Sequence, residues 1–155
     1  MRDQLCIISG GQTGVDRGAL DAALALGVRC GGWCPADRRD ENGLIPAKYP
    51  LMPLPQGGYL ARTRRNVADS DGTLIIHFGP PTGGTAATIR HVQKLSKPML
   101  CIDASTREIP DAISVALAFL RSAQIRVLNV AGPRESQEAR GHDYAQALLS
   151  GLLQQ

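Results

Sequence analysis

The sequence predicts a single α/β domain over residues 1–155, with an open, mostly parallel sheet of about five strands and helices on both faces. First, short apolar runs alternate with segments of helical periodicity, which is typical of βαβ units with right-handed crossovers. Second, two of the apolar runs end in glycine-rich turns that lead directly into a helix. Third, 155 residues with 43% hydrophobic and 20% charged side chains fit one globular domain with a normal core.

The strands are predicted where apolar runs are bounded by turn signals, at residues 5–9, 28–34, 73–78, 98–103 and 125–130. Gly31 and Gly32 weaken the second strand. The first helix is predicted to end near residue 26 and the last near residue 153. Three other helices are predicted at residues 59–70, 86–95 and 110–122. Gly27 suits the C-terminal end of the first helix.

Two segments depart from this alternation. Residues 35–57 have no periodicity and contain five prolines, together with apolar side chains that need a packing partner. Because long irregular segments in compact domains are often functional, we expect an ordered loop insertion that covers the site. The helix at 110–122 is apolar nearly all round, which favours a subunit contact and a homo-oligomer.

Composition argues against several classes of protein. The formal net charge of +3 is not concentrated in a basic block, and aromatic residues make up only 4% of the chain, so a nucleic-acid surface is not expected. No apolar run is long enough to span a membrane, and the N-terminus does not resemble a signal peptide. These features predict a cytoplasmic protein with reduced cysteines. Cys30 and Cys34 lack a nearby histidine, so no metal site is expected.

The turn at residues 10–16 is the first candidate binding element. Its glycines allow a sharp bend and a close approach of a ligand to the main chain, and the helix that follows offers unpaired amides at the positive end of its dipole. Such a helix start attracts anions. The sequence matches neither the dinucleotide-binding nor the P-loop motif.

Similar turns at residues 79–85 and 131–136 also follow strands. The carboxyl ends of parallel strands meet at one edge of the sheet, where open α/β folds bind ligands. We therefore predict a cleft for a small anionic ligand, lined by backbone amides, hydroxyls and an arginine that can bind a phosphate. The candidate binding residues are Gly10, Gly11, Gln12, Thr13, Gly14, Asp16, Arg17, Arg62, Asp71, Gly83, Gly84, Thr85, Gly132, Arg134 and Ser136.

Several of these polar residues have more than one interpretation. Asp16 either caps its helix, in a pair with Arg17, or accepts N–H groups from a ligand ring. Asp71 either ends a helix or belongs to the site. His77 lies in an apolar strand, where a hydrogen-bonded core histidine is the more common case. Arg62 points either to the cleft or to solvent.

The motifs, taken together and in order, resemble the molybdenum carrier family, whose members are also called molybdenum cofactor carrier proteins. The matching stretches are GGQTGVDRGALDAALALG at 10–27, GWCP at 32–35, I-P-x-x-Y-P-L at 45–51, RTRRNVADSDGTLI at 62–75, GGT at 83–85 and NVAGPRES at 129–136. The chain is also similar to a wider Rossmann-like superfamily that includes cytokinin-activating phosphoribohydrolases and nucleotide-sensing proteins.

The resemblance implies a homo-oligomer that holds molybdenum cofactor, a molybdopterin with a terminal phosphate, or molybdate or a nucleotide, and delivers it to molybdoenzymes. It also implies a non-enzymatic role. The related phosphoribohydrolases carry a catalytic glutamate after P-G-G-x-G-T, and Thr88 stands at that place here. The alternatives are a nucleotide or nucleoside-phosphate hydrolase that uses Asp16 or Asp71 as a general base, and a nucleotide-sensing module with the same cleft.

Overall fold

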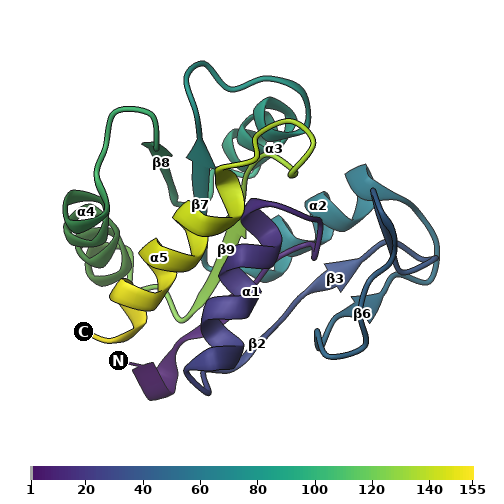
Figure 1. Cartoon of the computed structure of the whole chain (residues 1–155), viewed down its shortest axis with the longest axis horizontal. Helices are drawn as coiled ribbons and strands as arrows, with labels where there is room; N and C mark the ends of the chain where they lie inside the picture. Colours follow the sequence, from purple (N-terminus) through teal and green to yellow (C-terminus); the bar gives the residue numbers. More distant parts are fainter. Residues whose placement is uncertain (1) are drawn as a thin grey trace.

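The computed structural model describes residues 2–155, and this part of the chain folds around a five-stranded parallel sheet (Figure 1). The strands are β1 (Cys6–Ile8), β2 (Cys30–Gly31), β7 (Gly72–His77), β8 (Met99–Asp103) and β9 (Val127–Ala131). They lie in the order β2-β1-β9-β7-β8, and every pairing is parallel. The predicted fold class is therefore confirmed.

Helices cover both faces of the sheet. One face carries α1 (Val15–Ala25), α4 (Ile109–Ser122) and α5 (Gly141–Leu153), and the other carries α2 (Tyr59–Asp69) and α3 (Gly83–Lys94) (Figure 1). A short 3-10 turn, η1 (Arg2–Gln4), precedes β1. Helix α3 begins three residues before its predicted start. The prediction missed the first turn because glycine has a low helix propensity.

The main core lies between the sheet and the layer of α1, α4 and α5. Strand β7 crosses its centre with Leu74, Ile75 and Ile76 fully buried, as expected for a strand covered on both faces. Helices α1 and α5 pack closely at Gly18. A Cβ added at Gly18 would lie 2.3 Å from the carbonyl oxygen of His142.

The strand predicted at residues 28–34 is divided in two. After Gly31 the chain leaves the main sheet, and β3 (Trp33–Cys34) pairs in parallel with β6 (Met52–Pro53). Gly32 allows the change of direction because its φ is +126° and a Cβ there would lie 2.1 Å from the carbonyl oxygen of Ser9. Only glycine fits this position.

The aperiodic segment 35–57 is ordered by polar contacts as well as by burial. It contains the antiparallel pair β4 (Arg39–Asp40) and β5 (Gly43–Leu44). The Arg38 side chain donates to main-chain carbonyls along the rest of the segment, at Ile45, Pro46, Tyr49 and Leu51. Ile45, Tyr49 and Leu51 form a second small core with Leu20 of α1 and Cys34. The segment therefore packs on the outer side of α1.

A chain of hydrogen bonds connects α5, α1 and this segment. His142 Nε2 lies 2.7 Å from Asp21 Oδ2, and the Tyr49 hydroxyl donates to Asp21 Oδ1 at 2.6 Å. Burial and the Asp21 carboxylate raise the pKa of Tyr49 to about 12, so the hydroxyl remains a donor at neutral pH. Burial alone would lower the pKa of His142, but its hydrogen bonds with Asp21 and Asp143 outweigh burial and raise that pKa above its ordinary value.

We expect the His142→Gln variant to lose part of the pH dependence of stability. Because the pKa of His142 is raised in the folded chain, protonated His142 stabilises the fold fully below its unfolded-state pKa of about 6.5. This stabilisation is lost as pH rises through the folded-state pKa. The free energy of unfolding of the wild type should exceed that of the variant by about 0.5 kcal/mol at about pH 6, which is the scale of a partly exposed ion pair. The difference should be smaller at about pH 9. Urea unfolding at both pH values checks this, and a difference that grows with pH would contradict it.

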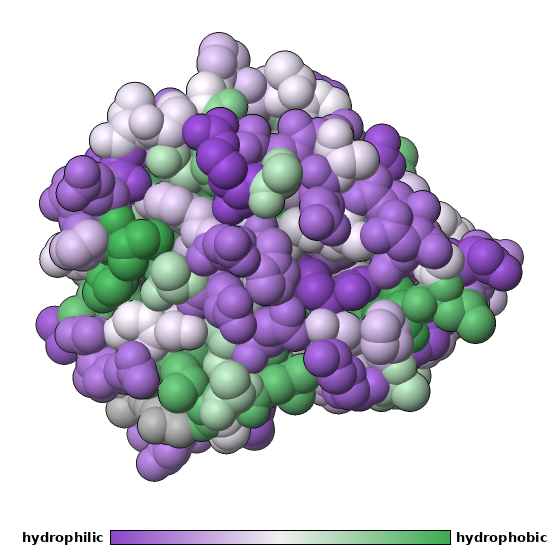
Figure 2. Space-filling view, in the orientation of Figure 1, coloured by the Kyte–Doolittle hydropathy of each residue, from purple (hydrophilic) through white to green (hydrophobic). Residues whose placement is uncertain are grey.

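The surface carries separate groups of hydrophobic side chains. Figure 2 shows one group over α4 and another toward β6 at the opposite end of this face. On α4, Ala112, Ala116 and Leu120 are buried, and the larger apolar side chains that remain are half-buried, while Ala118 is exposed. The subunit contact predicted for this helix remains a prediction. Met52 of β6 and Leu44 of β5 are 60% and 68% exposed.

Candidate functional site

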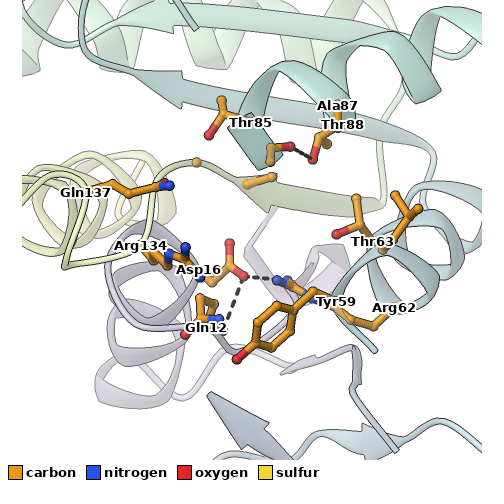
Figure 3. Close-up of a pocket in the computed structure, with 14 residues that line it drawn as sticks. Gln12, Asp16, Tyr59, Arg62, Thr63, Thr85, Ala87, Thr88, Arg134 and Gln137 are labelled. Carbon is orange, nitrogen blue, oxygen red and sulfur yellow. Dashed lines mark hydrogen bonds and ion pairs between the residues drawn. The ribbon is translucent and has the colours of Figure 1, made fainter. Parts of the chain in front are cut away.

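A cleft of about 300 Å³ opens at the edge of the sheet where β1, β7 and β9 end (Figure 3). This volume is at the lower end of the range for small-molecule sites. Residues from all three predicted turns lie on its walls. The lining residues are Gln12, Asp16, Tyr59, Leu60, Arg62, Thr63, Gly84, Thr85, Ala87, Thr88, Ala131, Gly132, Arg134 and Gln137.

The N-terminus of α3 forms one wall of the cleft. The Ala86 N–H donates to the Thr82 carbonyl at 3.2 Å, which is the first hydrogen bond of the helix. The amides of the helix before Ala86, beginning at Gly83, have no acceptor within the helix, and the Thr82 side chain makes no capping hydrogen bond. Gly84 lies on the cleft, and a Cβ there would meet nothing within 4 Å. The geometry therefore leaves the positive end of a 12-residue helix open to an anion.

The turn after β9 forms a second wall. Gly132 is required there by close packing, since an added Cβ would lie 2.5 Å from the carbonyl oxygen of Ile76. Arg134 lines the cleft, and its side chain is 39% exposed. Its Nε is buried without a hydrogen-bond acceptor and lies 3.8 Å from a Glu41 carboxylate oxygen. The guanidinium thus retains capacity to bind a ligand anion.

A buried ion pair forms the floor of the cleft. Arg62 Nη1 donates to Asp16 Oδ2 at 2.8 Å, and the Gln12 N–H donates to the same oxygen at 3.3 Å (Figure 3). Burial raises the pKa of Asp16, and the Arg62 guanidinium opposes that shift. Gly10 makes room for the pair, because a Cβ there would lie 1.6 Å from Arg62 Nη1. Arg62 therefore points to the cleft rather than to solvent, and Asp16 pairs with Arg62 rather than with Arg17.

The first glycine turn offers fewer amides to a ligand than predicted. Four N–H groups of residues 11–15 have acceptors within the chain. Gly11 donates to Ser9 Oγ, Gln12 to Asp16, and Thr13 to Gln12 Oε1, while Val15 at the start of α1 donates to the Pro133 carbonyl. An added Cβ at Gly11 would lie 2.2 Å from Leu51, and one at Gly14 would lie 2.4 Å from the Pro133 carbonyl oxygen. The glycines serve packing between the turn and its neighbours, and only Gln12 of residues 10–14 lines the cleft.

Acidic side chains from segment 35–57 occupy the outer side of this turn. Asp40 accepts from Arg17 Nη2 at 2.5 Å, and Glu41 accepts from the Thr13 hydroxyl and from the Ser136 N–H. Burial would raise the pKa of Glu41, but the hydrogen bonds from Ser136 and Thr13 and the charge of Arg134 lower it. No residue of the segment lines the cleft, so the expectation that it covers the site is wrong. Its carboxylates instead hold the two turns together.

Four further candidate residues lie away from the cleft lining. Asp71 precedes β7 at the opposite, amino edge of the sheet, where it accepts the N–H groups of Arg126 and Val127. Asp71 was therefore wrongly assigned to the site, because strand direction places it at the far end of β7. Arg17 is engaged by Asp40 and the Gly11 carbonyl, and the Ser136 amide by Glu41. Gly83 is the first residue of α3, but it does not line the cleft.

The charged residues that line the cleft differ from those expected in a phosphoribohydrolase site. Asp16 is the acidic residue among the lining residues, and Arg62 and Arg134 are the basic ones, so the described wall carries one excess positive charge. Thr88 lines the cleft where related phosphoribohydrolases have a glutamate, and its hydroxyl donates to the Gly84 carbonyl at 2.9 Å. The wall near α3 therefore offers no carboxylate for chemistry at a ribose.

Sequence reasoning missed several lining residues, among them Tyr59, Leu60 and Thr63 of α2 and Gln137 after β9. The only sequence signal for the three α2 residues is that a helix starts directly after the aperiodic segment. His77 lies beside the cleft in a smaller cavity with Phe78 and Pro80, and its Nδ1 lies 2.7 Å from the Gly79 carbonyl oxygen.

Residues 2–155 contain no group of three or more His, Cys, Asp or Glu side chains that could hold a metal ion. All four cysteines are free. Within the same range, every helix is too short or too polar to cross a membrane.

Comparison with known proteins agrees with this architecture. The model of the Circularly permutated YpsA SLOG family matches residues 7–153. A crystal structure from Syntrophus aciditrophicus SB, named a "putative molybdenum carrier protein", is 41% identical, covers 99% of this chain and 98% of its own, and superposes with a TM-score of 0.94. Among curated proteins, none is significantly similar. The resemblance to molybdenum carrier proteins is thus confirmed, and the chain belongs to the Circularly permutated YpsA SLOG family.

Proposed function

We propose that the protein binds molybdenum cofactor without transforming it, and stores or delivers it to molybdoenzymes. The observation that carries this proposal is the open N-terminus of α3, which faces the cleft together with Arg134. Helix amides and an arginine are suited to a terminal phosphate. The name of the 41% identical protein supports the same class of cargo.

The remaining walls suit the rest of such a cargo. Tyr59, Leu60 and Ala87 provide apolar surface near the cleft mouth, and Asp16 with Arg62 provides polar contacts at its floor. In this proposal the chain's own residues hold the anion and reduce the access of water to the cargo. They move no proton and form no bond with it.

The proposal includes a homo-oligomer in the cytoplasm, with α4 in the subunit contact. Molybdate and a nucleotide are alternative ligands, since both present oxyanions that the same wall would bind. A sensor of a signalling nucleotide would use the same cleft.

Anaerobic titration of the purified protein with molybdenum cofactor, followed by native mass measurement, tests the proposal. We expect one cofactor retained for each chain, with a mass that also reports the number of subunits. At about 100 times its dissociation constant, the cofactor should stabilise the fold by roughly 2.7 kcal/mol, which a thermal-shift series with molybdate and nucleotides would detect. Retention of a nucleotide together with loss of the cofactor on desalting would reject the proposal in favour of the sensor.

The second candidate is a nucleoside-phosphate hydrolase with Asp16 as the general base. One observation favours it, namely that Asp16 is a buried carboxylate inside the cleft with a raised pKa. Against it, Arg62 and the Gln12 amide already bind Asp16 Oδ2. Turnover of nucleoside monophosphates that is abolished in Asp16→Asn would establish the hydrolase.

A further inference from the structure

The two oxygens of Asp16 differ in their contacts. Oδ2 accepts from both Arg62 and Gln12, whereas no described residue donates a hydrogen bond to Oδ1. Figure 3 shows this second oxygen directed into the middle of the cleft. The Asp16 side chain is only 5% exposed, so Oδ1 reaches water or a ligand only through the cleft.

Arg62 also has unused hydrogen-bonding capacity. Within residues 2–155, its guanidinium donates to Asp16 from Nη1 alone, and its Nε is buried without an acceptor. A buried ion pair costs desolvation free energy that is recovered only when its remaining donors and acceptors are bonded. The pair therefore presents an acceptor, and a guanidinium with spare donors, at the floor of a cleft whose α3 wall is the proposed anion site.

We infer that the Asp16–Arg62 pair recognises a 2-amino-4-oxopyrimidine ring, the unit that pterins and guanine share. The exocyclic amino group donates to the free Oδ1 of Asp16, and the carbonyl of the ring accepts from Arg62. Tyr59 and Leu60 flank the same cleft with apolar surface for the face of the ring. The inference rests on the proposed function only in placing the cargo in this cleft, with its anionic group at α3.

The ligand side of the inference can be tested on the wild type. Pterin should bind at least tenfold more tightly than lumazine, which has a carbonyl in place of the 2-amino group and would direct an acceptor at Asp16. Guanosine should likewise bind more tightly than inosine, which lacks only that amino group. Calorimetry at about pH 7 measures all four probes. Equal binding within both pairs would overturn the inference, and the tighter of pterin and guanosine identifies the source of the ring.

The protein side uses Asp16→Asn. Asparagine keeps the size of the side chain but replaces one acceptor with a donor, so pterin affinity should fall at least tenfold while lumazine affinity is retained or rises. The matched control is Asp69→Asn, because Asp69 pairs with Arg65 and Trp33 outside the cleft. If Asp16→Asn unfolds, Asp16→Asn/Arg62→Gln removes both charges of the pair and should show the same loss of preference.

The outcomes separate this inference from the proposed function. Cofactor retention without discrimination between pterin and lumazine overturns the inference and leaves the carrier role standing. Discrimination that depends on Asp16, in a protein that releases the cofactor, supports the inference and rejects the carrier role. A preference that persists unchanged in Asp16→Asn shows that another group reads the ring and also overturns the inference.

Discussion

The Gly84→Asp variant should lose binding of the anionic ligand by at least ~100-fold while remaining folded. Gly84 lies on the cleft with free space around its Cα, so a new side chain enters the position that an anion would occupy. Two like charges about 4 Å apart repel by about 4 kcal/mol at an effective dielectric constant near 20, which is roughly a thousandfold in affinity. A carboxylate in the first turn of α3 also satisfies the helix amides and stabilises the helix by about 0.3–1 kcal/mol.

Titration of molybdate and of molybdenum cofactor against the variant measures this effect. Gly84→Asn is the matched control, because it fills the same volume without the charge and should retain more affinity than Gly84→Asp. Gly84→Ala should bind nearly as the wild type. If Gly84→Asp binds as tightly as the wild type, the anion does not bind at α3.

The Gly14→Ala variant should be destabilised by about 3 kcal/mol or more. Gly14 has a φ of +81°, and an added Cβ would lie 2.4 Å from the Pro133 carbonyl oxygen and 2.9 Å from two further main-chain atoms. Neither turn can move at low cost to relieve this contact, because the main chain of the turn after β1 lies directly against the main chain of the turn after β9. Urea unfolding monitored by circular dichroism measures the free energy of unfolding, and a shift in midpoint at constant slope reports stability alone.

Gly27→Ala separates backbone strain from collision. Gly27 has a similar φ of +66°, but a Cβ there would meet nothing within 4 Å. We expect this variant to lose only about 1–2 kcal/mol, the cost of a left-handed conformation for a residue with a side chain. Equal losses in the two variants would mean that contact between the two turns contributes little to the fold.

The elements of this fold were predictable because their signals are local. The apolar run of β7 and the alternation of strands and helices depend on residues close together in sequence, and the structure contains both. The start of α3 was displaced because glycine is a poor helix former in isolation, although Gly83 and Gly84 form its first turn. The strand at residues 28–34 was drawn too long because the contact of Gly32 with Ser9 is not visible in the local sequence.

The candidate site could be predicted only in outline. Parallel strands following one another along the chain were enough to bring Gln12, Gly84 and Arg134 to one cleft. The same rule, applied to strand direction, should have placed Asp71 at the other edge, since it precedes its strand. The direction of Arg62 had no sequence signal, because its partner Asp16 lies 46 residues away.

The sequence alone determined the α/β class, the approximate strands and helices, and the edge of the sheet that carries the cleft, since hydrophobic periodicity and turn chemistry are properties of neighbouring residues. Only the tertiary structure decided which of the two glycine turns remains open to a ligand. Leu51 and Arg62, from distant segments, pack against the glycines of the first turn, and Glu41 accepts a hydrogen bond from its Thr13. By contrast, a Cβ at Gly84 would meet nothing within 4 Å in the described chain. The difference arises from long-range packing, which the amino-acid pattern of either turn does not record.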